Sequence, residues 1–211
     1  MKRLVLAGLV LASGACTSAP LQLPDDPLER AAACTAARTL ELREGKQGDG
    51  PVTFAGATEI IHFAMLYAAE DAVEVDPRRL DAVKARSERA VAELAGQNWA
   101  SLVEPCNASY PETQKDPASL PGDPFEAGMT CYALGDFLAR SVQASFPDEQ
   151  RALAGMAERA LTAAQPALRE RARDDNAEAQ RIANGYAARA FKAGRPTLLL
   201  GQCRRRFPSR G

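Results

Sequence analysis

The apolar stretches of the chain are separated by prolines, glycines and short polar segments, which is the pattern of helices joined by brief connections. Alanine, the residue with the highest helix propensity, makes up about a fifth of the chain, whereas aromatic residues make up only 6%. Both features predict an all-α protein. We expect helices at about 27–44, 53–71, 77–96, 98–104, 124–144, 147–165, 167–193 and 196–206.

The second of these helices, 53–71, is apolar on nearly every side, whereas its counterpart at 150–165 is amphipathic. A helix without a polar face has to be covered all round, so we expect this one to be central. It would pack on its own half of the chain and also on the other half, on a partner or on an apolar ligand. Phe63 and Tyr67 are its candidate binding residues. The alternative is that both belong to the core between the halves.

Four of the cysteines are regularly spaced. Cys34 and Cys131 lie 97 positions apart, as do Cys106 and Cys203, so each half of the chain holds a pair separated by 72 positions. An internal duplication explains this spacing. A unit that was duplicated once folded alone and needed its own bridge, so we predict the disulfides Cys34–Cys106 and Cys131–Cys203. Each would connect the first helix of its half to the last segment, and closing such a loop contributes about 4 kcal/mol.

The sequences around the cysteines repeat as well. Asp-Pro-Leu-Glu at 26–29 precedes the first pair as Asp-Pro-Phe-Glu at 123–126 precedes the second, and Asp followed by Pro is a favourable helix start. We therefore predict two tandem disulfide-stapled helical repeats, at 26–111 and 123–208, packed into one helical bundle. The polar, proline-rich segment 112–122 would be the linker between them.

The first residues indicate export from the cytoplasm. Two basic residues precede an apolar run too short to cross a bilayer, and small residues follow, so we interpret 1–15 as a signal peptide. The sequence Ser-Gly-Ala-Cys at 13–16 resembles the lipobox of bacterial lipoproteins, except that Ser13 replaces the usual aliphatic residue. The resemblance implies that Cys16 carries lipid and is the first residue of the mature chain.

The number of cysteines agrees with lipidation. Five cysteines leave one without an intramolecular partner in an oxidising compartment, and lipid on Cys16 would account for it. Thr17 rather than Asp follows this cysteine, which by the same resemblance favours the outer membrane over the inner one. Residues 16–25 would then be a tether, and the folded part would face the periplasm. Ordinary cleavage after Ala15, giving a secreted soluble protein, is the alternative.

The chain contains a single histidine, and its surroundings offer little chemistry. Glu59 and His62 lie three positions apart on one polar ridge of helix 53–71, which is half of the Glu-x-x-His pattern that di-iron helix bundles use twice. The other half of the chain supplies no second pattern. We therefore predict no metal, no cofactor and no catalytic residue. We expect His62 to be a partly buried, hydrogen-bonded side chain.

Charge differs between the two halves. The whole chain has a formal net charge of −1, which disfavours nucleic acid as a partner. Residues 26–111 carry nine basic and fourteen acidic side chains, against fifteen and twelve in 112–211. Arg204, Arg205 and Arg206 form a dense basic group, a candidate contact for anionic lipid, a cell-wall polymer or an acidic protein surface. Alternatively, they provide a favourable positive end for the last helix.

These features favour a non-catalytic cell-envelope lipoprotein, a helical module that binds an envelope protein or a cell-wall component. Two alternatives stay open. One is a small hydrolase or transferase with an acidic cleft between the repeats, and the other is a carrier for an apolar ligand along helix 53–71. A concave site with several carboxylates and shifted pKa values would indicate the enzyme, whereas a closed apolar cavity would indicate the carrier.

Overall fold

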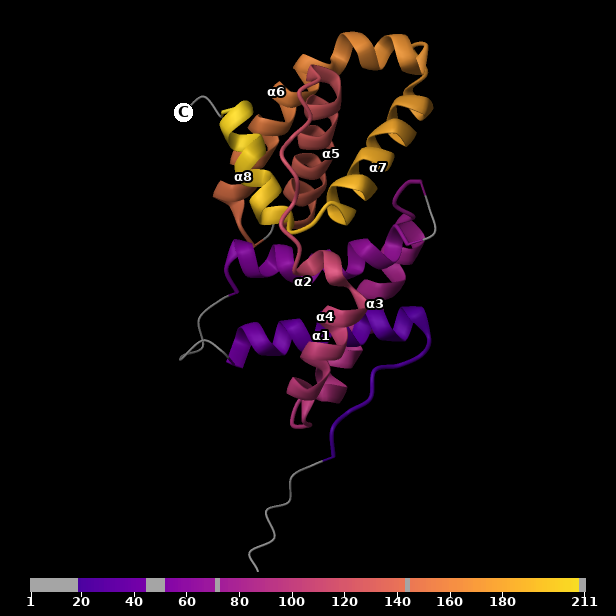
Figure 1. Ribbon diagram of the computed structural model, residues 1–211, viewed down its shortest axis with the longest axis vertical. Coiled ribbons are helices and arrows are strands. Elements are labelled where there is room, and N and C mark those ends of the chain that lie inside the picture. The colour runs from indigo at the N-terminus through magenta and orange to yellow at the C-terminus, as the bar shows by residue number, and fades with distance from the viewer. Residues whose placement is uncertain (1–18, 45–51, 71–72, 143–144, 209–211) are drawn as a thin grey trace, which may run out of the picture.

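A computed structural model describes residues 19–44, 52–70, 73–142 and 145–208 (Figure 1). Within these ranges the regular structure is all helical, as the sequence predicts, and there is no strand. The predicted signal peptide and Cys16 lie outside the described residues. The helices are α1 (Pro27–Glu44), α2 (Phe54–Ala68), α3 (Pro77–Leu94), the 3₁₀ helix η1 (Trp99–Leu102), α4 (Val103–Ser109), the 3₁₀ helix η2 (Pro111–Thr113), α5 (Pro124–Val142), α6 (Pro147–Ala172), α7 (Asn176–Lys192) and α8 (Pro196–Arg206).

The helices form two groups, which lie one above the other in Figure 1. Helices α1, α3 and α4 belong to the lower, N-terminal half and α5 to α8 to the upper, C-terminal half, while α2 lies along the boundary between them. Each half has its own apolar core. The N-terminal core includes Phe63, Val83, Leu102 and Tyr110, and the C-terminal core includes Met129, Leu134, Leu138, Met156 and Phe191.

Helix α2 packs on both halves. It contacts α1 and α3 from the N-terminal half and α5, α7 and α8 from the C-terminal half. Phe63 lies in the N-terminal core, where its ring meets that of Tyr110 edge to face at a centroid distance of 5.6 Å. Met65 and Ala68, both fully buried, belong to the C-terminal core. These two sets of contacts explain why so much of the surface of this helix is apolar.

Two disulfides are present, and they join the cysteines that the spacing predicts. Cys34 on α1 is bonded to Cys106 on α4, and Cys131 on α5 is bonded to Cys203 on α8. The Cα atoms of each pair lie 5.4 Å apart, and all four residues are buried. Each disulfide therefore connects the first and last α-helices of one half.

The first helix of each half begins after an aspartate that caps it. The backbone amide of Glu29 donates to Oδ1 of Asp26 at 2.9 Å, and that of Glu126 donates to Oδ1 of Asp123 at 2.8 Å. These bonds satisfy amides that have no partner inside the helix. The two Asp-Pro motifs thus have the role that the sequence predicts.

The predicted break between two helices at Pro166 is wrong. Helix α6 continues through this proline as far as Ala172, and the chain turns instead at Arg173 and Asp174, which both have positive φ angles. Asp175 then caps α7. An internal proline removes one backbone hydrogen bond and costs about 3 kcal/mol. The close packing of α6 along α5 offsets this cost.

Gly128 on α5 makes that packing possible. A Cβ atom at this position would lie 2.7 Å from the carbonyl oxygen of Ala160 and 2.9 Å from the Cβ of Ala164, both on α6. Both distances are shorter than van der Waals contact, so a larger residue would push the two helices apart. The contact spans the turn of α6 just before Pro166.

Other boundaries differ from the prediction by a few residues. The apolar helix expected at 53–71 is shorter, because α2 ends at Ala68, and residue 71 lies outside the described residues. The short piece expected at 98–104 is the 3₁₀ helix η1, and α4 continues from it to Ser109. Among the helices of the described residues, none combines the length and the apolar character needed to cross a membrane.

Candidate functional site

A groove lies between the two halves, beside α2. It is bounded by α1, α2, α3, the end of α5 and the residues just before α6, it is partly open to solvent, and its volume is about 870 Å³. Sites for small molecules typically measure about 300–1,000 Å³. We name it the inter-half groove. Its apolar wall includes seven half-buried side chains larger than alanine: Val52, Ile60, Ile61, Leu80, Val91, Phe137 and Phe146.

Helices α2 and α3 each turn one face toward the inter-half groove. On α3 the lining residues recur every three or four positions from Leu80 to Val91, and on α2 they do so from Ala57 to Ala64. This is the spacing of residues on a single helix face. The apolar surface of α2 is therefore divided among three neighbours: the N-terminal core, the C-terminal core and the groove.

Four of the five described hydroxyl groups that line the groove, all except that of Ser145, are bound to their own helices. Because each uses its only proton in this way, none is left to donate to a ligand. The groove is thus less polar than its composition indicates. The bonds, all 2.8–2.9 Å long, run from Thr35 to the carbonyl oxygen of Ala31, from Thr39 to that of Thr35, from Ser87 to that of Lys84 and from Ser141 to that of Phe137.

Three charged side chains are among the described residues that line the groove. Arg43, Lys84 and Glu88 line it and are exposed. Lys84 also lines an adjoining cavity of about 330 Å³ on the side toward α7, together with Asp136 and Arg140. Those two residues form an ion pair at 2.7 Å. Among the described residues, no carboxylate lies within ion-pair distance of Lys84.

His62 lies on α2 next to the groove residue Ile61, but it is not one of the residues that line the groove. Its ring is 1% exposed, and Nε2 donates to the carbonyl oxygen of Phe191 on α7 at 2.8 Å. The ring of Phe191 in turn meets that of Phe137, a groove residue, edge to face at 5.4 Å. Burial is the main cause that lowers the pKa of His62 to about 4, so the imidazole is neutral at pH 7.

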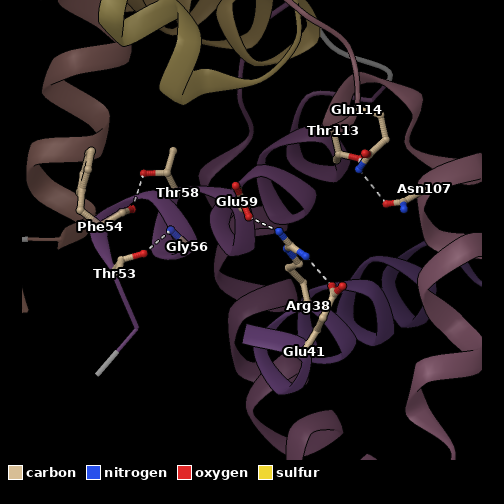
Figure 2. A network of polar contacts seen from close by, with 10 residues as sticks. All are labelled: Arg38, Glu41, Thr53, Phe54, Gly56, Thr58, Glu59, Asn107, Thr113 and Gln114. Atoms are coloured by element: carbon tan, nitrogen blue, oxygen red, sulfur yellow. Dashed lines mark hydrogen bonds and ion pairs between the residues drawn. The ribbon is translucent and has the colours of Figure 1, made fainter. Parts of the chain in front are cut away.

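Glu59 faces a different neighbour. Figure 2 shows its carboxylate directed at Arg38 on α1, with which it forms an ion pair. Arg38 also pairs with Glu41 on its own helix. Glu59 and His62 therefore have separate partners, on α1 and α7. Nowhere in the described ranges do three or more His, Cys, Asp or Glu side chains form a group that could hold a metal ion.

The candidate binding residues Phe63 and Tyr67 are not part of the groove lining. Phe63 is 3% exposed and lies in the N-terminal core. Tyr67 is half-buried against the same core, and the guanidinium carbon of Arg79 lies 4.2 Å from the centroid of its ring. The residues through which α2 reaches the groove are Ile60 and Ile61.

The three arginines on α8 differ in their contacts. Arg204 forms an ion pair with Glu149 on α6. Arg206 donates to two carbonyl oxygens in the segment before α5, at 3.2 and 3.1 Å. Arg205 is exposed. Two of the three thus hold α8 against the rest of the C-terminal half, and all three place positive charge at the C-terminal end of the helix, where it is favourable.

The sequence contains only part of the signal for the groove. Ile60 and Ile61 belong to the helix that the sequence shows to be apolar on nearly every side. Leu80 and Val91, by contrast, lie on the apolar side of an amphipathic helix, and such a side is expected to pack into a core. The way the two halves pack decides that these residues share an open hollow.

Comparisons with protein-family models, with curated proteins and with solved structures give no match.

Proposed function

We propose that this protein is a non-catalytic binding module of the bacterial cell envelope, anchored by lipid at Cys16, and that it binds in the inter-half groove. The observation that carries the proposal is the apolar wall of the groove. Seven apolar side chains larger than alanine stay half-buried around a volume of about 870 Å³, although four of them also pack against the C-terminal core. Covering apolar surface contributes about 25 cal/mol per Å², so a ligand or a partner segment would be stabilised there.

The groups near the groove favour binding over catalysis. Among the described residues, the titratable side chains that line it are Arg43, Lys84 and Glu88, a set without a nucleophile beside a base. The acidic cleft of a hydrolase would bring several carboxylates together, whereas Glu88 is the carboxylate in this set. The histidine is not one of the lining residues, and its Nε2 donates to the main-chain oxygen of Phe191.

The two halves resemble each other at their ends, which supports an origin by duplication. Tyr110 and Phe207, 97 positions apart, follow α4 and α8 with φ and ψ angles of −129° and 67° and of −128° and 66°. The amide of each donates to the carbonyl oxygen of the cysteine four residues earlier. The matching backbone conformations after α4 and α8 and the equal spacing of the two disulfides are features expected of tandem repeats.

The segments that precede the first helices are also alike. The amide of Leu21 donates to Oγ of Ser101, and the amide of Leu120 donates to Oε1 of Gln202, both at 2.8 Å. In each half, the segment before the first helix is thus bound to the segment that closes the half. We accordingly propose repeats at 26–111 and 123–208.

Cysteine use and the first residues support a location in the envelope. Structural disulfides persist in oxidising compartments, and each half contains one. The chain begins with the basic, apolar and small residues of a signal peptide, and Cys16 follows them as in a lipobox. The proposal therefore places the folded part in the periplasm, held at the outer membrane.

Photo-cross-linking in envelope preparations tests the binding function. A photoreactive amino acid replaces Ile60 or Phe146 in the groove, and the control replaces Leu198, which is 40% exposed and is not part of the groove lining. We expect adducts at the two groove positions, reduced by an excess of unlabelled wild-type protein, and none at the control position. Equal labelling at all three positions, or none at either groove position, would contradict the proposal.

A further inference from the structure

We propose that the ligand of the inter-half groove is a single-chain anionic amphiphile, with its acyl chain against the apolar wall and its carboxylate beside Lys84. This inference rests on the binding function proposed for the groove and names the class of ligand. It follows from three properties of the groove: its length, the hydrogen-bonding state of its wall and the position of its charges.

The groove is long and offers little hydrogen bonding. It follows α3 from Leu80 to Val91, a distance of roughly 16 Å at 1.5 Å per residue. The four wall hydroxyls described above already donate to their own helices, so a sugar or a polar peptide would find few donors there. An unbranched hydrocarbon chain needs no hydrogen-bond donors. Its binding is stabilised because it covers the half-buried apolar side chains.

The residues that the groove shares with the adjoining cavity show at which end of the groove the head group would lie. Four residues line both the groove and the adjoining cavity, and they mark the end where the two hollows meet: Leu80, Lys84, Phe137 and Ser141. Val91 and Phe146 line the groove alone and mark the part where the chain would lie.

Lys84 is the suitable partner for a carboxylate. Its ammonium has three donors and forms no ion pair with any described carboxylate, whereas Asp136, on the other side of the junction, is paired with Arg140. Of the two remaining charged residues that line the groove, Glu88 and Arg43, one is negative and one positive. The described residues of the groove lining therefore carry a net positive charge, which is complementary to an anionic head group.

Three probes with the same chain and different head groups test the inference. Dodecanoate, dodecanol and dodecyltrimethylammonium are titrated into the full mature protein below their micelle concentrations, and binding is measured by calorimetry. We expect dodecanoate to bind most tightly and the cationic probe most weakly. Lys84→Gln should weaken dodecanoate binding by about tenfold and leave dodecanol binding unchanged, because it removes one charge-assisted hydrogen bond. Unchanged dodecanol binding also shows that the groove of this variant is intact.

Matched variants separate the head from the chain. Lys115→Gln removes an exposed lysine outside the groove and should leave the affinity for all three probes unchanged. Ile60→Ser should weaken all three. Equal affinity for the three probes would overturn the assignment of Lys84, and failure of the wild type to bind any of them would overturn the acyl-chain ligand. In that last case, groove-specific cross-links to an envelope protein would preserve the proposed binding function and assign the groove to a protein partner.

Discussion

His62 on α2 donates its Nε2 proton to the main-chain oxygen of Phe191 on α7, 2.8 Å away, and this hydrogen bond crosses from one half of the protein to the other. The ring is 1% exposed, and burial lowers its pKa to about 4 from an ordinary value of 6.5. The contact between the halves therefore includes a group that is neutral in the folded protein at pH 7. Protonation in the unfolded chain competes with folding.

We predict that stability falls as the pH drops from about 6.5 to about 4. Within this window the unfolded chain binds a proton at His62 and the folded protein does not, so the free energy of unfolding rises with pH. The whole effect amounts to roughly 3 kcal/mol, because one unit of pKa shift corresponds to about 1.4 kcal/mol. Denaturant unfolding at a series of pH values measures it.

His62→Gln is the control for this prediction. Glutamine does not titrate, and its amide can donate to the same oxygen, so the variant should show a flatter stability profile between these pH values. Parallel profiles for the wild type and the variant would show that another group is responsible. Groove cross-linking should be unchanged in this variant. Loss of function in folded His62→Gln would instead make Glu59 and His62 an active-site candidate.

The disulfides should map within the halves and contribute to stability. Non-reducing peptide mapping should link Cys34 to Cys106 and Cys131 to Cys203. Replacing both members of either pair by alanine should lower the free energy of unfolding by about 2–5 kcal/mol, since the open loop gives the unfolded chain more freedom. A peptide linking Cys34 to Cys131 would contradict both the fold and the proposed duplication.

Phe63→Ala should destabilise the protein by about 3–5 kcal/mol, because the side chain is 3% exposed in the N-terminal core and its removal leaves a cavity. Val73→Ala, at a position that is 85% exposed, should change stability by less than about 0.5 kcal/mol. Thermal and denaturant unfolding provide the measurement. If Phe63→Ala abolished groove binding while the unfolding transition stayed in place, Phe63 would belong to a binding surface.

Gly128→Ala should destabilise the C-terminal half by about 1–3 kcal/mol, because its Cβ would collide with the backbone of α6 at Ala160. Gly201→Ala on α8 is the matched control, since its Cβ would meet only the end of the Arg205 side chain, at 3.7 Å. That substitution should stabilise the helix by about 0.5–1 kcal/mol. Equal effects of the two substitutions would argue against a close contact between α5 and α6.

Cys16 should be the lipidated first residue of the mature protein. Mass spectrometry of the protein purified from its native membrane should show an N-terminal peptide that starts at this residue and carries acyl chains. Cys16→Ser should release the protein from the membrane fraction. An unmodified N-terminus at Thr17 or beyond would contradict the lipid anchor and favour a secreted form.

Local chemistry made much of the fold predictable. Asp26 and Asp123 mark helix starts because an N-cap needs only the residues next to it. The disulfide pairing followed from a duplicated spacing, which the sequence shows directly. Pro166 was misleading, because the contact that carries α6 past it depends on Gly128, nearly forty positions earlier in the chain.

The groove could not be predicted from local sequence patterns. Its wall combines Ile60 and Val91 from the N-terminal half with Phe137 and Phe146 from the C-terminal half, and no local pattern connects them. Periodicity shows which side of a helix is apolar, but not whether that side meets another helix or an open hollow. The exposure of Lys84 beside this wall likewise depends on where the halves stop touching.

The position of the two disulfides determines which parts of the molecule can move independently. The four cysteines of the described residues form disulfides within the halves, so each half is closed by a covalent bond. The packing of α2 against α5, α7 and α8, by contrast, involves non-covalent contacts alone. The disulfides therefore place no restraint on a rocking of one closed unit against the other. The inter-half groove has walls on both units, so this rocking changes its width without breaking a covalent bond.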